Sequence, residues 1–145
     1  MSTSLLYHAF GIRGGYEYVR TDYSEGEILL SIRQPRVRLR CAQCGSPDVH
    51  LKTHEHRSFR GLPIGSKPVW IHLPIARVEY QKCGVSRQVK VPFARERVSY
   101  TNSFERYVLE LSAFMTIQDL AGHLQVSWDV VKGIWRAPQN LLQLL

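Results

Sequence analysis

The sequence predicts an α+β protein in which a β-rich N-terminal part precedes a helical C-terminal part. Two periodicities support this prediction. Up to residue 93, short runs alternate apolar with polar residues between Gly and Pro, as half-buried strands do. From residue 102, apolar residues recur every three to four positions, which is the period of an amphipathic helix. We therefore divide the chain into segments 1–34, 35–93, 94–137 and a tail, 138–145.

The first segment is predicted to form a short apolar stretch followed by a β-hairpin. Apolar and polar residues alternate over residues 16–23 as in a strand, and the sequence Ser24-Glu25-Gly26 favours a tight turn. The apolar positions that follow repeat at period two, at Ile28, Leu30 and Ile32.

The second segment is predicted to be a small basic β-domain, with its clearest strands at 56–60, 69–73, 77–80 and 87–91. The net charge of the chain is +7, and 14 of its 19 Lys and Arg residues lie between Arg33 and Arg97, with only four acidic residues among them. Such a surface attracts polyanions, of which nucleic acid is the commonest; the alternative is a solvated basic face.

Two cysteine-containing turns in this segment resemble the knuckles of a zinc ribbon. Cys41 and Cys44 form a Cys-x-x-Cys pair followed by Gly, and Cys83 is also followed by Gly. Tyr80 occupies the position at which the second knuckle would carry its first cysteine. A neutral phenol is a poor zinc ligand, so the sequence predicts three ligands.

Three hypotheses about the metal remain open. Zinc is held by three cysteines plus a histidine or water, or metal binding is weak, or the ribbon has lost its zinc. The histidines between the knuckles have no spacing that singles one out as the fourth ligand, and each is better explained as a surface or strand-face side chain: His50, His54, His56 and His72.

The third segment is predicted to contain three helices. The first has apolar residues from Phe104 to Met115 and Asn102 at its start, and the second follows Thr116, with Asp119 as its capping partner. The third begins after Ser127.

The second and third of these helices fit a helix-turn-helix. Ala121 is small enough for a helix crossing, and Gln125 lies where the turn favours a positive φ and usually takes Gly. The apolar contact positions around the alanine are all filled, by Leu120, Leu124, Val126, Val131 and Ile134. The alternative is a plain three-helix bundle without a ligand.

If the motif binds DNA, residues 127–136 form the recognition helix. We expect Lys132 and Arg136 to reach bases or phosphates, while Asp129 is equally suited to the helix dipole and Trp128 to packing. The candidate DNA-binding residues of the whole chain are Arg57, Arg60, Ser127, Trp128, Lys132 and Arg136.

Four blocks of the chain resemble the N-terminal region of insertion-sequence transposases of the ISL-three family: 40–46, 57–65, 77–84 and 125–132. The resemblance runs from about Leu5 to Trp135. It implies a zinc ribbon, a helix-turn-helix and binding to the terminal inverted repeats of a mobile element. It also implies that Cys41, Cys44 and Cys83 are three of four zinc ligands.

Members of this family continue into a nuclease domain with an acidic triad, whereas this chain ends after Pro138 in a leucine-rich tail. We therefore expect a truncated, DNA-binding fragment without catalytic activity, which acts alone, as a homo-oligomer or with a full-length transposase. An enzyme that uses Cys83 as nucleophile would need a partnered histidine and acid, and no local pattern indicates them.

Two other functions remain open, a zinc-ribbon module that binds another protein and a small transcriptional regulator. The sequence has no apolar run of about 18 residues and no secretory signal, so we expect a cytoplasmic, nucleoid-associated protein without a membrane anchor.

Overall fold

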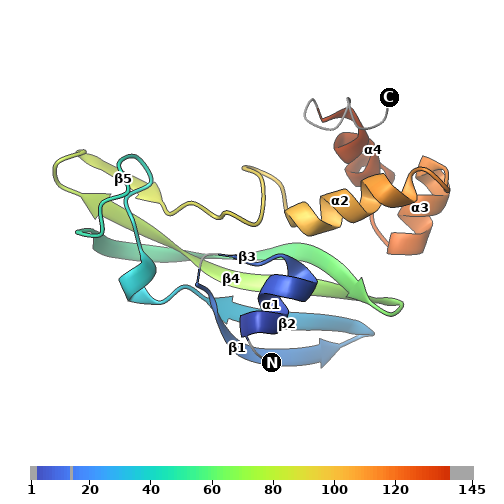
Figure 1. The fold of residues 1–145 in the computed structure, drawn as a ribbon, viewed down its shortest axis with the longest axis horizontal. Coiled ribbons are helices and arrows are strands. Elements are labelled where there is room, and N and C mark those ends of the chain that lie inside the picture. Colours follow the sequence, from blue (N-terminus) through green and yellow to red (C-terminus); the bar gives the residue numbers. More distant parts are fainter. Residues whose placement is uncertain (1–2, 14, 138–145) are drawn as a thin grey trace.

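The computed structural model describes residues 3–13 and 15–137, and their fold is α+β with five strands and four α-helices (Figure 1). The predicted tail, 138–145, lies outside the described residues. The elements follow in the order α1 (Thr3–Phe10), β1 (Glu17–Ser24), β2 (Glu27–Arg33), the 3-10 turn η1 (Arg36–Arg38), β3 (His50–Ile64), β4 (Lys67–Tyr80), β5 (Val85–Gln88), α2 (Asn102–Leu111), α3 (Ile117–Leu124) and α4 (Trp128–Arg136).

The strands form a single sheet in the order β1-β2-β4-β3, and β5 also pairs with β4. The β1–β2 hairpin agrees with the alternation in the sequence. Its second strand lies parallel to β4, with Ile28 opposite Val69 and Ser31 opposite His72. The expected division at residue 34 therefore separates two parts of one sheet.

Strand β4 is longer than the sequence predicts, because the expected strands 69–73 and 77–80 are one strand that continues through Pro74. On one side, β4 pairs with β3 along its length. On the other side, β2 pairs with residues 69–72 and β5 with residues 77–80. Pro74 lies between these two partners, where a proline without an N–H breaks no ladder hydrogen bond.

One hydrophobic core lies on the face of the sheet that α1 covers. Leu6 and Phe10 of α1, Phe59 of β3, and Val69 and Ile71 of β4 are all buried in it. Phe93, from the segment that follows β5, contacts Phe59 edge to face. The hairpin contributes Ile28, Leu30 and Ile32 to the same core.

A second hydrophobic core holds α2, α3 and α4 together. Five of the six predicted contact residues are buried in it, and Val126 packs against it partly buried; the five are Leu120, Ala121, Leu124, Val131 and Ile134. Gln125 ends α3 with φ 56° and ψ 47°, the left-handed conformation that its place in the turn requires. The amide of Val126 then bonds the carbonyl of Ala121 at 3.1 Å.

Hydroxyl side chains cap these three helices at their N-termini. Thr116 accepts a hydrogen bond from the amide of Asp119, and Ser127 accepts one from Val130, as the sequence predicts. The expected cap at Asn102 is wrong by one residue. Thr101 is the N-cap of α2, because its buried hydroxyl accepts from the amide of Phe104, and the side chain of Asn102 donates to the Pro92 carbonyl instead.

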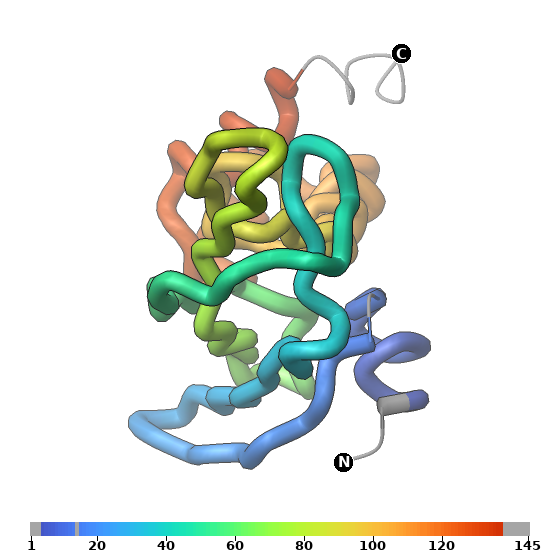
Figure 2. The backbone as a smooth tube through the Cα atoms, turned by 90° about the vertical axis from the view of Figure 1, so that its left-hand side faces the viewer, coloured from blue at the N-terminus to red at the C-terminus, as the bar shows by residue number. Residues whose placement is uncertain are grey.

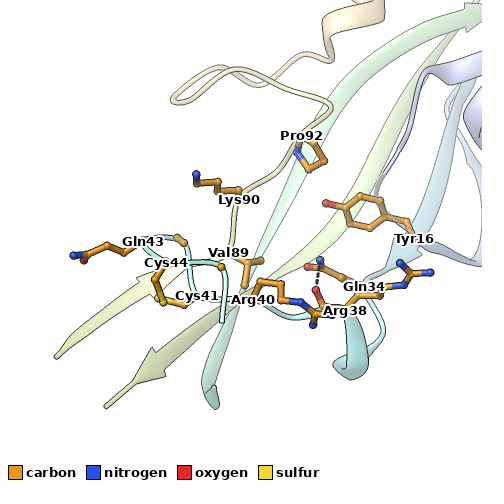
Figure 3. Close-up of a pocket in the computed structure, with 12 residues that line it drawn as sticks. Tyr16, Gln34, Arg38, Arg40, Cys41, Gln43, Cys44, Val89, Lys90 and Pro92 are labelled. Carbon is orange, nitrogen blue, oxygen red and sulfur yellow. Dashed lines mark hydrogen bonds between the residues drawn. The ribbon is translucent and has the colours of Figure 1, made fainter. Parts of the chain in front are cut away.

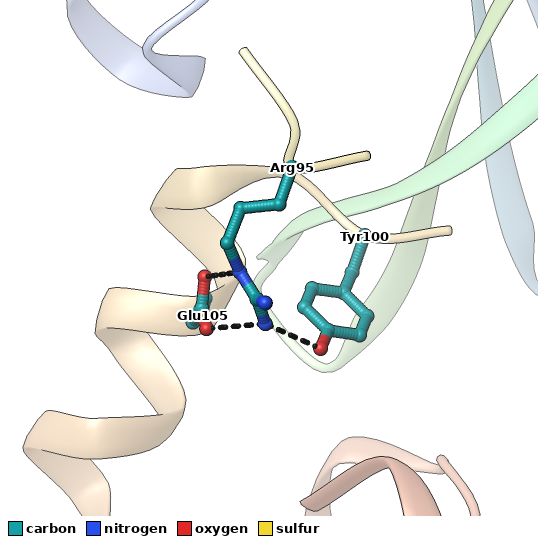
Figure 4. Close-up of polar contacts among 3 residues, drawn as sticks. All are labelled: Arg95, Tyr100 and Glu105. Atoms are coloured by element: carbon teal, nitrogen blue, oxygen red, sulfur yellow. Dashed lines mark hydrogen bonds and ion pairs between the residues drawn. The ribbon is translucent and has the colours of Figure 1, made fainter. Parts of the chain in front are cut away.

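An ion pair fixes the segment that leads into α2 (Figure 4). The guanidinium of Arg95 donates to both carboxylate oxygens of Glu105, at 3.0 and 2.7 Å, and to the hydroxyl of Tyr100 at 3.0 Å. The Glu105 side chain is only 8% exposed, so its charge needs such a partner. The pair raises the pKa of Arg95, which stays charged.

The molecule is elongated. The cysteine-containing turns lie at one end of the sheet, side by side in Figure 2, and helices α2–α4 lie at the other end (Figures 1 and 2). The segment after β5 runs between the two ends (Figure 1).

Every helix of the described residues is too short or too polar to cross a bilayer.

Candidate metal centre and nucleic-acid interface

The two knuckles have the same backbone geometry. In the first, the amide of Gly45 donates to the carbonyl of Cys41 at 2.8 Å; in the second, the amide of Gly84 donates to the carbonyl of Tyr80 at 3.1 Å. Both glycines have positive φ, 77° and 66°. Tyr80 is therefore the structural counterpart of Cys41, as the spacing in the sequence predicts.

The knuckles bring the three cysteine sulfurs together. The Sγ atoms of Cys41, Cys44 and Cys83 all lie within 4.8 Å of one another, and Cys41 is buried while Cys44 is exposed. Zinc–thiolate bonds of about 2.3 Å in a tetrahedral site place sulfurs about 3.8 Å apart, so a small contraction suffices to bind zinc. The donor set fits three corners of a zinc site.

The electrostatics of the cluster favour one thiolate and resist further ionisation. Backbone N–H groups of Cys44 and Gln43 lower the pKa of Cys41 to about 7. A hydrogen bond with Cys44, burial and the neighbouring thiols raise the pKa of Cys83 to about 11. A bound cation would remove this repulsion, because metal ligation requires deprotonated thiols.

No histidine of the described residues joins this cluster. His56 and His72 lie instead on the sheet, where their rings stack and Nδ1 of His56 is 3.1 Å from Nε2 of His72. Burial and the charges of His56 and Arg20 lower the pKa of His72. The fourth position therefore has no protein ligand of the predicted kind among residues 3–13 and 15–137.

A pocket of about 390 Å³ lies beside the first knuckle, between it and η1 (Figure 3). Its positive residues are Arg38, Arg40 and Lys90, and Arg40 is occupied with the carbonyls of Val37 and Leu39. The hydroxyl of Tyr16 borders it but is fully buried, and burial raises its pKa to about 12. This hydroxyl is thus closed to a ligand in the pocket.

A larger groove, of about 610 Å³, lies along the segment between β5 and α2. We call it the basic groove; its charged lining residues are Arg57, Arg87, Lys90, Arg95, Glu96 and Arg97. Arg87, Lys90 and Arg97 are exposed, whereas Arg95 is held by Glu105. Sequence reasoning singled out Arg57, which is half-buried and donates to the Val98 carbonyl at 3.0 Å.

Arg60 requires a correction. The sequence predicts a DNA contact, but Arg60 is 4% exposed and its guanidinium donates to the backbone carbonyl of Leu124, at 2.5 Å. A side chain enclosed in this way is not available to a phosphate. The sequence shows the charge of Arg60 but not that its side chain reaches the carbonyl at the end of α3.

Helix α4 presents the predicted residues outward. Ser127, Trp128 and Arg136 are exposed, and the Ser127 hydroxyl also serves as the N-cap. Nζ of Lys132 lies 4.2 Å from the centroid of the Trp128 ring, so both share one face, as their spacing predicts. Gly133 lies beside them in open space, with no atom within 4 Å of the place a Cβ would take.

Two family models match the chain. Residues 38–83 match the zinc-finger of transposase IS204/IS1001/IS1096/IS1165, and residues 89–136 match the helix-turn-helix domain of transposase family ISL3. The chain is also 24% identical, over 135 residues, to the transposase for insertion sequence element IS1001 of Bordetella parapertussis. That alignment covers 91% of this chain and 33% of the relative. No solved structure matches the chain.

Proposed function

We propose that the chain binds double-stranded DNA at the terminal inverted repeats of a mobile element, because residues 38–83 and 89–136 match the zinc-finger and helix-turn-helix models of insertion-sequence transposases. The observation that carries this proposal is the outward face of α4. It combines the exposed Trp128 and Arg136 and the half-buried Lys132 with a buried face that fixes α4 on α3. A helix held in this way can enter a major groove without rearrangement.

Phosphate contacts are assigned to the basic groove. Its exposed cations, Arg87, Lys90 and Arg97, lie on the segment that links the cysteine knuckles to the helices. Cations on such a segment can neutralise phosphates beside the base pairs that α4 reads. In this proposal the groove supplies affinity for any duplex, and α4 supplies the discrimination between sequences.

Zinc, where bound, would be held by Cys41, Cys44 and Cys83 and would join the two knuckles. Its role here is structural: it would cross-link two turns at the end of the sheet and neutralise their thiolates.

The salt dependence of DNA binding tests the groove. Replacing Arg87 and Lys90 together with Ala is expected to flatten the slope of log K against log salt by about 1.8, since each phosphate contact contributes about 0.9. Fluorescence anisotropy with a labelled duplex at several salt concentrations measures the slope.

The matched control removes two other exposed arginines, Arg20 and Arg33, which pair with Asp22 and Glu17 on the hairpin and do not line the groove. This variant should retain the wild-type slope. Equal slopes for all three proteins would remove the groove from the interface.

Gly133 provides a second test. Glycine at an exposed position of a helix is less stable than alanine, so we expect its presence on the outward face of α4 to serve a function. Gly133→Ala is expected to stabilise the fold by about 0.5–1 kcal/mol, because alanine is the better helix former and has room there. It should nevertheless weaken DNA binding, because a Cβ would keep the backbone of α4 away from the bases.

Gly122 of α3 is the matched control, since it is also exposed and a Cβ there would meet no atom within 4 Å. Gly122→Ala should stabilise the fold equally and leave DNA affinity unchanged. Thermal melts and anisotropy of both variants decide the question: unimpaired DNA binding by Gly133→Ala would place this face of α4 outside the interface.

A further inference from the structure

The Arg60 side chain joins the sheet to the end of helix α3. It starts from β3 and donates from one nitrogen to the carbonyl of Leu124 and from the other to that of Gln125, at 2.5 and 3.4 Å. These carbonyls belong to the last residue of α3 and to the left-handed residue that starts the turn. The contact therefore reaches the turn that sets the angle between α3 and α4.

The guanidinium of Arg60 lies between aromatic rings and the end of α3, where its two terminal nitrogens donate and its buried Nε has no hydrogen-bond partner. Its guanidinium carbon lies 5.3 Å from the centroid of the Phe104 ring and 5.9 Å from that of Trp70, so α2 and β4 both contribute an aromatic face. Carbonyls at the C-terminus of a helix carry partial negative charge and attract a cation. Burial lowers the pKa of Arg60, and the charge of Glu27 opposes that change.

The backbone of Arg60 makes a second connection to the helices. Its amide donates to the carbonyl of Ser99 and its carbonyl accepts from the amide of Thr101, at 2.8 and 2.9 Å. Thr101 is the N-cap of α2. One residue of the sheet thus holds both the start of α2 and the end of α3.

We propose that Arg60 is a positioning residue that fixes the three-helix unit, α2–α4, against the sheet. The chain then contacts DNA as one rigid body, with α4 and the basic groove at a constant separation and rotation. The partner is a duplex with two contact patches, one for α4 and one for the groove, at a fixed spacing. This specificity for spacing rests on the proposed function, whereas the rigid connection does not.

The rigid connection is tested without DNA, by NMR relaxation of backbone amides in the full chain. The wild-type protein should give one rotational correlation time for strands β3 and β4 and for helices α3 and α4. Arg60→Met, which keeps the length of the side chain but removes the charge and the donors, should give a shorter time for the helices. Arg20→Met makes the same change on β1, away from α3, and should behave like the wild type.

Two results would overturn the connection. One is a single correlation time in a folded Arg60→Met protein, and the other is separate times in the wild type. Arg60→Lys provides a second variant if Arg60→Met does not fold, because it retains the charge but lacks the planar fork that spans two carbonyls. If neither variant folds, the wild-type measurement decides.

The spacing is tested on a duplex that the wild-type chain selects from a random library. Inserting five base pairs between its two protected patches rotates them by about half a turn, so wild-type binding should fall on the order of 100-fold. Arg60→Met should bind the original duplex more weakly and lose only about tenfold on the insertion. Equal losses for both proteins would overturn the role of Arg60 in setting the spacing. Failure to select any duplex would count against the proposed function alone.

Discussion

Tyr80→Cys is expected to increase zinc affinity by about 100-fold, or roughly 3 kcal/mol, which is the share of one ligand in a four-thiolate site. Tyr80 has the same place in the second knuckle as Cys41 has in the first, and its carbonyl accepts the equivalent hydrogen bond from Gly84. A thiol there would complete a tetrahedron with three sulfurs that already lie within 4.8 Å of one another. Because metal binding is coupled to folding, the melting temperature with zinc should rise by roughly 5 °C or more.

Competition with a chelator of known zinc affinity measures the first effect, and thermal melts with and without zinc measure the second. Tyr23→Cys is the control, since it adds a thiol at an exposed position of β1 outside the cluster. Unchanged affinity in Tyr80→Cys would show that a fourth ligand already completes the site or that the knuckles do not hold zinc.

The helical part of the fold could be predicted in detail from the sequence. Its signals are local: Ala121 and the apolar residues around it occupy a fixed pattern, and the hydroxyls of Thr116 and Ser127 mark the starts of helices. Even the left-handed conformation of Gln125 follows from its place in the turn. The N-cap of α2 is Thr101 and not the expected Asn102, which is the next residue, because the side chains of both residues can serve as caps.

The sheet could be predicted only in pieces, since its pairings are not local. Nothing near β2 in the sequence indicates a parallel partner about 40 residues later, yet this pairing places the hairpin in the main core. Pro74 suggested a break in β4, and only the gap between two partner strands explains why it is tolerated.

The clustering of the three cysteines could be predicted from the sequence, whereas the exposure of the individual basic residues could not. Cysteine spacing fixes which three sulfurs meet, and the missing ligand at Tyr80 is visible in the sequence. Whether a basic side chain is exposed depends instead on which elements pack over it. Arg60 and Lys90 read alike as cations of a basic segment, but α3 covers the first and the second is exposed.

Lys132→Ala is expected to have the second large effect, a loss of discrimination between DNA sequences. This substitution tests whether α4 reads bases. Lys132 is half-buried against the exposed Trp128 ring, on the face of α4 that also holds Gly133. A lysine so placed can donate to guanine O6 and N7 in the major groove, which is worth about 1–3 kcal/mol of discrimination, or roughly 5- to 150-fold. A solvated lysine on an inert helix bundle would contribute to neither affinity nor discrimination.

Lys90 offers the matched comparison, since it is an exposed lysine of the basic groove. Lys90→Ala should lower affinity for all duplexes alike, as the loss of a phosphate contact does. The two lysines thus separate discrimination from nonspecific attraction within one protein.

The deciding measurement is the affinity of the wild type, Lys132→Ala and Lys90→Ala for two duplexes of equal length at one salt concentration. One duplex is selected by the wild type from a random library, and the other has random sequence. We predict that Lys132→Ala weakens binding to the selected duplex at least fivefold more than binding to the random one, a ratio within the range for base contacts. Losses of equal size on both duplexes would contradict the proposal that α4 reads DNA sequence.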